Sequence, residues 1–279
     1  TQGFSMNILK NLKIKNKLIL SYSFVFVVQF MIMTIFMGIF INKLIFNLQF
    51  DNTEKIVENT KNMLLLTFDN TIKSYLRGIA EKNLEIVEKY YEKYQKGELK
   101  ENDAKKIVTD IILSQKIGKT GYVAGVNSKG ILVIHPKAPG TDASGYDFMK
   151  KAISMKNGYL EYNWKNPGEP KERAKAGYMR YFQPWDIIIW VSSYKEEFSH
   201  LINPEDFEKS LLDVKIGKTG YIFIMDSKGN IIIHPFLKGK NILESGEGND
   251  NSFAKEIVEK KNGVVRYFWK QQNESKKRE

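Results

Sequence analysis

Four side chains that can donate hydrogen bonds or stack on a ligand occur twice in this chain. KIGKTGYVAGVNSKGILVIHP (116–136) is followed ninety-nine residues later by KIGKTGYIFIMDSKGNIIIHP (215–235), with 13 of 21 positions identical. KNGYLEYNWK (156–165) matches KNGVVRYFWK (261–270) in six of ten positions. The shared side chains are Tyr122/Tyr221, His135/His234, Tyr162/Tyr267 and Trp164/Trp269. Because both copies keep them, these residues are more typical of a scaffold than of a specific site.

Each of these residues has two open interpretations. His135 is either a strand-end histidine bonded to the backbone or a hydrogen-bond donor in a pocket. A metal role is disfavoured, because the chain has only three histidines and none forms an i, i+4 pair. Tyr162 and Trp164 are either aromatic core residues or part of a box around a ligand. Tyr122 is a candidate ligand contact beside them.

The composition disfavours several other kinds of chemistry. The chain has no cysteine, which excludes disulfides and thiolate chemistry. Ser/His/Asp constellations, glycine-rich phosphate loops and paired-histidine metal motifs are not found, so we expect neither an enzyme nor a cofactor. The net charge is +11, but lysines alternate with glutamates as on solvated helix faces, and we expect no nucleic-acid partner.

An uncharged apolar segment near the N-terminus predicts a membrane span. LILSYSFVFVVQFMIMTIFMGIFI (18–41) has 24 residues, about 36 Å as a helix, which exceeds a hydrocarbon core of about 30 Å. A cleaved signal peptide is the rival, but no small-residue cleavage site follows. Four lysines precede the span within residues 1–17 and only Lys43 follows directly, which predicts a cytoplasmic N-terminus and an extracytoplasmic remainder. Residues 1–5 look like a non-native or upstream remnant.

The segment 42–96 predicts a long stalk helix. Apolar residues recur there mostly in steps of three, four or seven, with Asn83 in a gap of the stripe. The alternative is two helices broken at Gly78. The exposed stripe favours pairing with a second copy of the chain, giving a homodimer.

Residues 97–200 predict a first α+β module. A helix is expected over 100–114, and then a hairpin of 121–126 and 131–135 joined by a polar loop that ends in glycine. A short helix near 148–155, a strand at 156–165 and two further strands turning at 183–185 complete five antiparallel strands. Residues 201–279 repeat this order but stop before the last two strands, so we expect a second, truncated module.

These motifs resemble the Cache sensory domain of bacterial transmembrane receptors, including chemoreceptors and sensor kinases. The likeness covers roughly residues 7–279 and rests on G-Y, H-P, N-G-x-x-x-Y-x-W and K-x-x-Y-x-x-Y-F-x-P-W together. It implies PAS-like sheets in a double-Cache receptor, with small ligands in the membrane-distal module. Trp190 and Ser192 depart from the family, which tends to have small residues there, and Trp190 could fill or reshape a pocket.

The resemblance also marks Lys175, which matches the lysine of the family's K-x-x-Y motif. An ammonium directed at a carboxylate forms a charge-assisted hydrogen bond worth roughly 1.5–3 kcal/mol. Tyr178 and Tyr181 could add hydroxyl donors, and the alternative for Lys175 is a solvent-facing lysine. We therefore expect a sensory region that binds a small organic acid. The rival is a membrane-anchored interaction protein without a small-molecule ligand.

Overall fold

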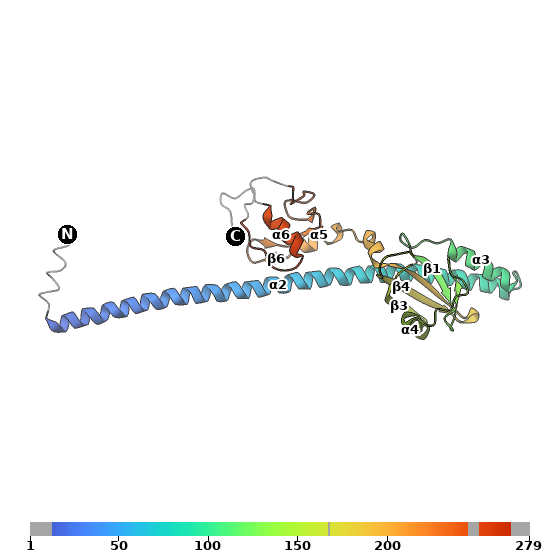
Figure 1. Cartoon of the computed structure of the whole chain (residues 1–279), viewed down its shortest axis with the longest axis horizontal. Coiled ribbons are helices and arrows are strands. Elements are labelled where there is room, and N and C mark those ends of the chain that lie inside the picture. Colours follow the sequence, from blue (N-terminus) through green and yellow to red (C-terminus); the bar gives the residue numbers. More distant parts are fainter. Residues whose placement is uncertain (1–12, 167, 245–250, 269–279) are drawn as a thin grey trace. The chain divides into compact units, whose positions relative to one another are not determined.

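A computed structural model describes residues 13–166, 168–244 and 251–268 (Figure 1). Two compact units divide the chain: residues 1–60 with 215–220, and residues 61–214 with 221–279. A single helix, α2 (Ile14–Gln95), contains both the apolar segment and the predicted stalk. At 1.5 Å per residue, its 82 residues extend about 120 Å. The helix is continuous through Gly78, so the alternative of two helices is wrong.

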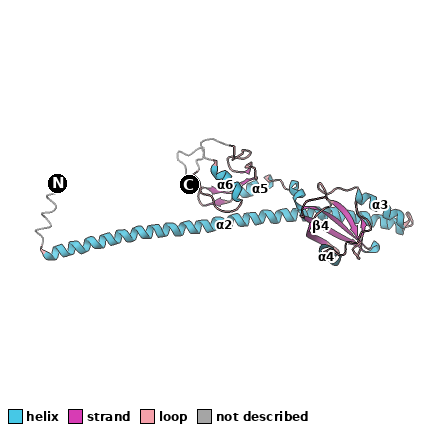
Figure 2. Ribbon diagram, in the orientation of Figure 1, coloured by secondary structure: helices cyan, strands magenta, loops and turns pink. Residues whose placement is uncertain are grey.

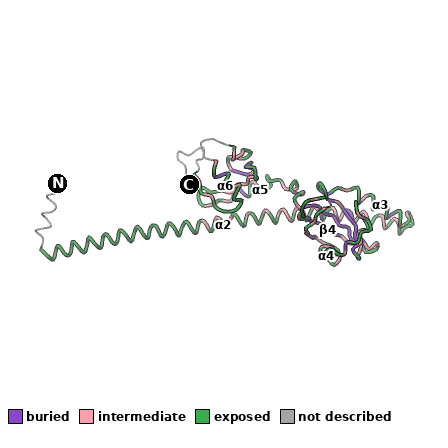
Figure 3. The backbone as a smooth tube through the Cα atoms, viewed as in Figure 1, coloured by how far each residue is buried: buried purple, intermediate pink, exposed green. Residues whose placement is uncertain are grey.

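The apolar part of α2 has the properties of a membrane span. Its most apolar window has a mean hydropathy of 2.5, and none of that window is buried within the chain. Figure 3 shows this part of the helix as exposed throughout. Long apolar side chains with no protein partner need an apolar surrounding, which a bilayer supplies.

The antiparallel sheet predicted for the first module is present (Figure 2). Helix α3 (Glu101–Leu113) precedes strands β1 (Tyr122–Val126) and β2 (Leu132–Ile134). Helix α4 (Asp147–Met155) is followed by β3 (Gly158–Trp164), β4 (Arg173–Phe182), a 3₁₀ turn (Gln183–Trp185), β5 (Ile187–Tyr194) and a 3₁₀ helix (Lys195–Leu201). The strand order is β2-β1-β5-β4-β3, and every neighbouring pair is antiparallel.

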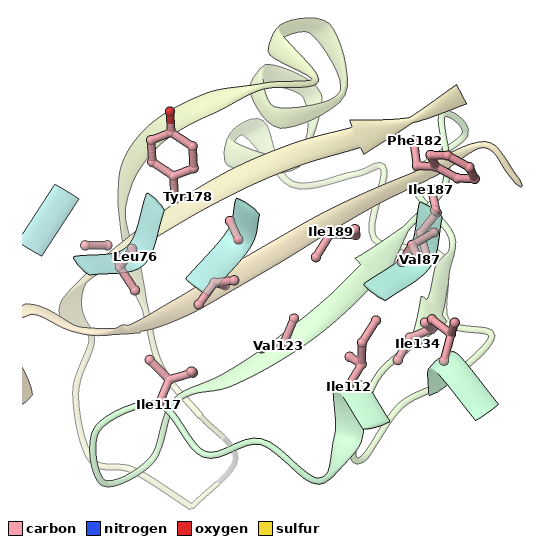
Figure 4. Close-up of a cluster of buried hydrophobic side chains, with 14 of the residues drawn as sticks. Leu76, Val87, Ile112, Ile117, Val123, Ile134, Tyr178, Phe182, Ile187 and Ile189 are labelled. Atoms are coloured by element: carbon pink, nitrogen blue, oxygen red, sulfur yellow. The ribbon is translucent and has the colours of Figure 1, made fainter. Parts of the chain in front are cut away.

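One face of this sheet packs against α2 and α3. The contact is a cluster of buried apolar side chains (Figure 4). It includes Leu76 and Val87 of α2, Ile112 of α3, and Val123 and Ile189 of the sheet. The apolar stripe of α2 from Phe68 onward contacts this same cluster. That half of the stripe is therefore occupied by the chain's own sheet, and it does not serve a second copy.

The other face of the sheet packs against α4. Met149 and Ala152 of α4 contact Leu160, Met179 and Trp190 in a second cluster. Side chains alternate between faces along a strand, so the register assigns each residue to one cluster or the other.

The C-terminal segment has shorter elements. It contains α5 (Glu205–Leu212), β6 (Lys215–Ile216), β7 (Gly220–Tyr221), β8 (Ile224–Met225), β9 (Ile231–Ile233) and α6 (Ser252–Lys260). β8 and β9 form the hairpin predicted from the repeat, and α6 is the predicted short helix. The strand predicted at 261–270 is not formed over residues 261–268, and the remainder lies outside the described residues. In the first module the equivalent strand is β3, which pairs with β4. The described part of the C-terminal segment has no counterpart of β4.

Candidate functional site

Lys175 lies on the α4 face of the sheet, in β4. Met179, four residues further along the strand, belongs to the cluster on that face, whereas Ala176 and Tyr178 belong to the cluster under α2. The register places Tyr162 of β3 and Tyr194 of β5 directly opposite Lys175. Directly opposed residues point to the same side of a sheet, so the three side chains share one face.

The ammonium group of Lys175 is buried without a counter-ion. Only 1% of the residue is exposed, and its Nζ lies 4.5 Å from the ring centre of Tyr122 and 5.6 Å from that of Tyr194. Within the described part of the chain, Nζ makes no hydrogen bond and no ion pair. Burial lowers the pKa of Lys175 to about 8, although the carboxylates of Glu197 and Glu169 oppose the shift. The solvent-facing alternative for this lysine is therefore wrong.

Tyr122 and His135 form a bonded pair beside Lys175. The His135 Nδ1 accepts the backbone N–H groups of Lys137 and Ala138, so the neutral ring carries its proton on Nε2. That Nε2–H donates to the Tyr122 hydroxyl at 3.1 Å. Burial, followed by the charge of Lys175, lowers the pKa of His135, which keeps it neutral. The Tyr122 hydroxyl thus accepts a hydrogen bond from His135 and can donate its own O–H to a ligand.

The repeat reproduces this pair in the C-terminal segment. Backbone N–H groups of Phe236 and Leu237 donate to the His234 Nδ1, and the Nε2 of His234 lies 3.2 Å from the Tyr221 hydroxyl. Burial lowers the pKa of His234 to about 4. The interpretation of these histidines as strand-end residues bonded to the backbone is therefore confirmed for both copies.

Tyr162 and Trp164 belong to an aromatic layer next to Lys175. Phe148 of α4 stacks on Tyr162 with ring centres 4.5 Å apart and meets the edge of Trp164 at 5.5 Å. Trp190 contacts Tyr162 at 5.4 Å. Burial raises the pKa of Tyr162, so its hydroxyl stays protonated. Phe148, Tyr162 and Trp190 belong to the cluster under α4, on the face of the sheet that carries Lys175.

The structure adds an acidic residue that the sequence analysis did not identify. The Glu169 carboxylate accepts hydrogen bonds from the Tyr194 hydroxyl, from Arg173 and from the backbone N–H of Asn166. The bond from Tyr194 is the main reason that the pKa of Glu169 falls to about 2. Arg173 also bonds Glu196, and its guanidinium lies 3.5 Å from the ring centre of Tyr194. The sequence did carry a signal for the residues that bind Glu169. The alternation of side chains along β4 and β5 places Arg173 and Tyr194 on the same face as Lys175.

Tyr178 and Tyr181 do not join Lys175. Tyr178 is three positions away, an odd spacing, and it is buried in the cluster under α2 on the opposite face. Tyr181 shares the face of Lys175 but lies six residues away, and its hydroxyl donates to Asp186 at 3.0 Å. The structure thus brings together Lys175, Tyr122, His135, Tyr162 and Trp164, and it separates the two tyrosines from them.

A shallow hollow lies elsewhere, on α2. It has a volume of about 500 Å³ and is lined by Thr67, Asn70, Thr71, Ser74, Tyr75 and Leu201. It contains no charged side chain, and α2 covers the sheet face opposite Lys175. We therefore place the candidate site at the buried ammonium. Among the described residues, no group of three His, Asp or Glu side chains is arranged to hold a metal ion.

Comparison with known proteins gives a family model that matches most of the chain. The family model described as "Cache domain" matches residues 42–279. A periplasmic sensor domain of a chemotaxis protein is 21% identical, covering 44% of this chain and 94% of that chain, with a TM-score of 0.40. A Cache chemosensory domain described for carboxylic acid recognition is 19% identical, covering 45% and 94%, with a TM-score of 0.41. A methyl-accepting chemotaxis protein from Vibrio parahaemolyticus is 18% identical, covering 50% and 99%, with a TM-score of 0.40.

Proposed function

Because the chain belongs to the Cache domain family, a family of ligand-binding sensory modules rather than enzymes, we propose that it is the sensing region of a bacterial transmembrane receptor. In this proposal a small organic acid binds on the α4 face of the sheet in residues 97–200, the membrane-distal module. Residues 201–279 form a second, membrane-proximal module. The apolar segment 18–41 of α2 anchors the receptor in the cell membrane, with residues 1–17 in the cytoplasm and 42 onward outside.

The buried Lys175 ammonium is the observation that supports an organic acid as the ligand. An unpaired charge inside a protein is strongly destabilising, and burial of this group is tolerated better once a partner supplies the opposite charge. Strongly shifted pKa values of buried groups also mark functional sites more often than ordinary positions. A ligand carboxylate can accept from the Lys175 Nζ and from the Tyr122 hydroxyl, whose own acceptor position His135 already fills.

Signalling would follow from the differential affinity of a ligand for two conformations. A carboxylate that binds the closed state more tightly shifts the population towards it. We propose that closure displaces the helices packed on the sheet by about 1–2 Å, a typical amplitude for helix shifts in switching proteins.

A homodimer remains part of the proposal, but its contact must lie in the part of the predicted stripe that precedes Phe68, nearer to the membrane. Phe68 and the later stripe residues pack on the chain's own sheet, whereas Met63 is 43% exposed. A second copy that covers Met63 should allow a single-cysteine Met63→Cys chain to form a disulfide-linked dimer under mild oxidation. Lys96→Cys, at the far end of the helix, is the matched control, and equal cross-linking of both variants would argue against a specific contact.

The test of the proposed function is a thermal-shift screen of the full chain in detergent. Small carboxylates, amines and sugars are added at millimolar concentration. A ligand at 100 times its Kd should stabilise the fold by about 2.7 kcal/mol, which raises Tm by several degrees. The shift should vanish in Lys175→Met and persist in Lys129→Met, which removes an exposed lysine. No response to any carboxylate from a well-folded chain would favour the rival function, a membrane-anchored interaction module.

A further inference from the structure

The dipeptide Asn-Gly occurs in both copies of the repeat. Asn157 directly precedes β3 and Gly158 begins it, whereas Asn262 and Gly263 follow α6. An asparagine side chain reacts readily with the backbone nitrogen of a following glycine, because glycine has no Cβ to obstruct the approach. Both sites have the local sequence Lys-Asn-Gly, so a large difference in their reactivity has to come from the surrounding structure.

The reaction is the deamidation of asparagine. The glycine nitrogen attacks the side-chain carbonyl carbon of the asparagine, a C–N bond forms, and ammonia leaves with the proton of the glycine N–H. Water then opens the resulting succinimide ring at either carbonyl, which gives aspartate or isoaspartate. In balance, an amide NH₂ is replaced by an acid OH, so the reaction consumes only water and adds a negative charge at neutral pH.

The two sites have the same local backbone. Lys156 and Lys261 have φ angles of 60° and 58°, and the glycines two positions later have φ angles of 120° and 132°. Asn157 and Asn262 are both exposed to solvent. Neither the local conformation nor the access of water therefore separates one site from the other.

The tertiary surroundings of Asn157 restrain it. Its Oδ1 accepts the backbone N–H of Tyr181 at 3.0 Å, and Gly158 is paired with Met179 of β4. The side-chain carbon can reach the Gly158 nitrogen only if the bond to Tyr181 breaks and the end of β3 opens. Such local opening costs free energy when the strand belongs to a packed sheet, so the reactive geometry is seldom reached.

Asn262 lacks both restraints. No strand forms over residues 261–268, and the side chain of Asn262 makes no hydrogen bond within the described part of the chain. A Cβ atom on Gly263 would meet nothing within 4 Å, so the surroundings leave room for the ring to close. The reactive geometry is then accessible without opening a sheet.

We propose that Asn262 is a site of spontaneous deamidation and that the fold protects Asn157 from the same reaction. The new carboxylate stands two residues beyond Lys260, the last residue of α6. A negative charge near the C-terminal end of a helix is unfavourable, so the modified chain should hold α6 less firmly. The inference goes beyond the proposed function and does not depend on a ligand.

The test follows both sites by peptide mapping with mass spectrometry. The full chain in detergent is held at pH 8 for several days, folded in one sample and unfolded in concentrated urea in another. In the folded sample we expect Asn262 to deamidate at least tenfold faster than Asn157. In urea the two rates should agree within threefold, because the protecting sheet is gone. Equal rates in the folded chain, or an Asn262 that survives as long as Asn157, would overturn the proposal.

Matched variants give a second readout by ion-exchange chromatography. Asn262→Gln should abolish the acidic form that accumulates in the folded wild type, whereas Asn157→Gln should leave it. An acidic form that persists in Asn262→Gln would assign the modification to another residue and overturn the proposal. Asn262→Asp, which carries the charge of the product, should increase hydrogen exchange within α6 relative to Asn157→Asp. Equal exchange in these two variants would overturn the effect on α6.

Discussion

Lys175 is one buried charge on which both the stability of the fold and the proposed ligand binding depend. Its ammonium faces two aromatic rings and has no acceptor within the described part of the chain, and its pKa falls to about 8 because burial disfavours the charged form. An unfolded lysine has a pKa near 10.4. The ligand-free fold therefore binds this proton less tightly than the unfolded chain does, and a ligand carboxylate should reverse that difference.

The first prediction concerns the stability of the ligand-free protein. At pH 7 the buried charge costs on the order of 3 kcal/mol, so Lys175→Met should raise Tm. Between pH 8 and about 10.4 the unfolded state holds more protons than the fold, so wild-type stability rises with pH there relative to the variant. Denaturant unfolding of both proteins at pH 7, 8, 9 and 10 measures the difference. A stability difference that stays constant with pH would contradict a lowered pKa for Lys175.

A second prediction concerns the pH dependence of binding. In the proposed function the acid ligand needs the charged lysine, so its affinity should be constant between pH 6 and pH 7.5. Above pH 8 the affinity should fall towards tenfold per pH unit, because the free site loses its proton. Calorimetry in two buffers of different ionisation enthalpy should also detect proton uptake on binding at pH 9. Affinity that is unchanged up to pH 10 would show that Lys175 does not contact the acid.

At the scale of elements, the repeated hairpins show how short sequence motifs build the same turn twice. Asn127 Oδ1 accepts the backbone N–H groups of Lys129 and Ile131, and Asp226 Oδ1 accepts those of Lys228 and Asn230. The Tyr–His pairs join the two ends of each hairpin in the same geometry. The bonds of Asn127 and Asp226 depend on residues close in sequence, so the repeated motif forms the same turn twice.

Acid should weaken these hairpins. Burial lowers the pKa of His234 to about 4, below an unfolded value of about 6.5. The unfolded state then binds more protons between pH 6.5 and pH 4, so the stability that His234 contributes is complete above pH 6.5 and is lost as the pH falls. His234→Gln should flatten the loss of stability in that range, as measured by urea unfolding at pH 4.5, 5.5 and 6.5. His200→Gln, at an exposed histidine, is the control and should leave the slope unchanged.

Helix α2 is fixed to its domain by a polar pair inside the apolar core. Asn83 Nδ2 donates to Gln115 Oε1 at 2.9 Å, and Gln115 Nε2 donates to Asn83 Oδ1 at 2.7 Å. Asn83 is 1% exposed, and it fills the gap in the apolar stripe. The pair forms in only one axial position of the helix, so it specifies the register of α2 against the segment after α3.

A double-mutant cycle tests this pair. Asn83→Leu removes both hydrogen bonds to the half-buried amide of Gln115, which keeps only its bond to Ile111 O, so we expect a loss of about 1–3 kcal/mol in the free energy of unfolding. Adding Gln115→Leu should recover much of that loss, because both polar partners are then gone. The recovery gives the coupling energy. Additive single losses would mean that the two amides act independently.

At the scale of the whole molecule, one helix links an exposed apolar segment to a packed sheet. The segment 18–41 has no protein partner, whereas the end of the same helix packs against the sheet under the Asn83–Gln115 pair. This arrangement fits a membrane receptor of the Cache family.

The orientation of the anchor is open to a direct test, since the chain has no native cysteine to interfere. Lys96→Cys should react with a membrane-impermeant maleimide added to intact cells. Lys15→Cys should react only after the membrane is permeabilised, because lysines favour the cytoplasmic side. The reverse pattern of labelling would place the sheet domain in the cytoplasm.

Much of the fold could be predicted from the sequence because it depends on local patterns. The apolar run predicts the span, the helical spacing predicts the helix over 42–96, and the short apolar segments with glycine-terminated turns predict five antiparallel strands. The site depended more on tertiary structure. Only the register of β1, β3, β4 and β5 decides that Lys175 faces Tyr122, Tyr162 and Tyr194 and that Tyr178 lies on the opposite face. The same pairing places Trp190 over Gly177. Residue type determines what a side chain can bind, but strand pairing over long sequence distances determines which side chains meet.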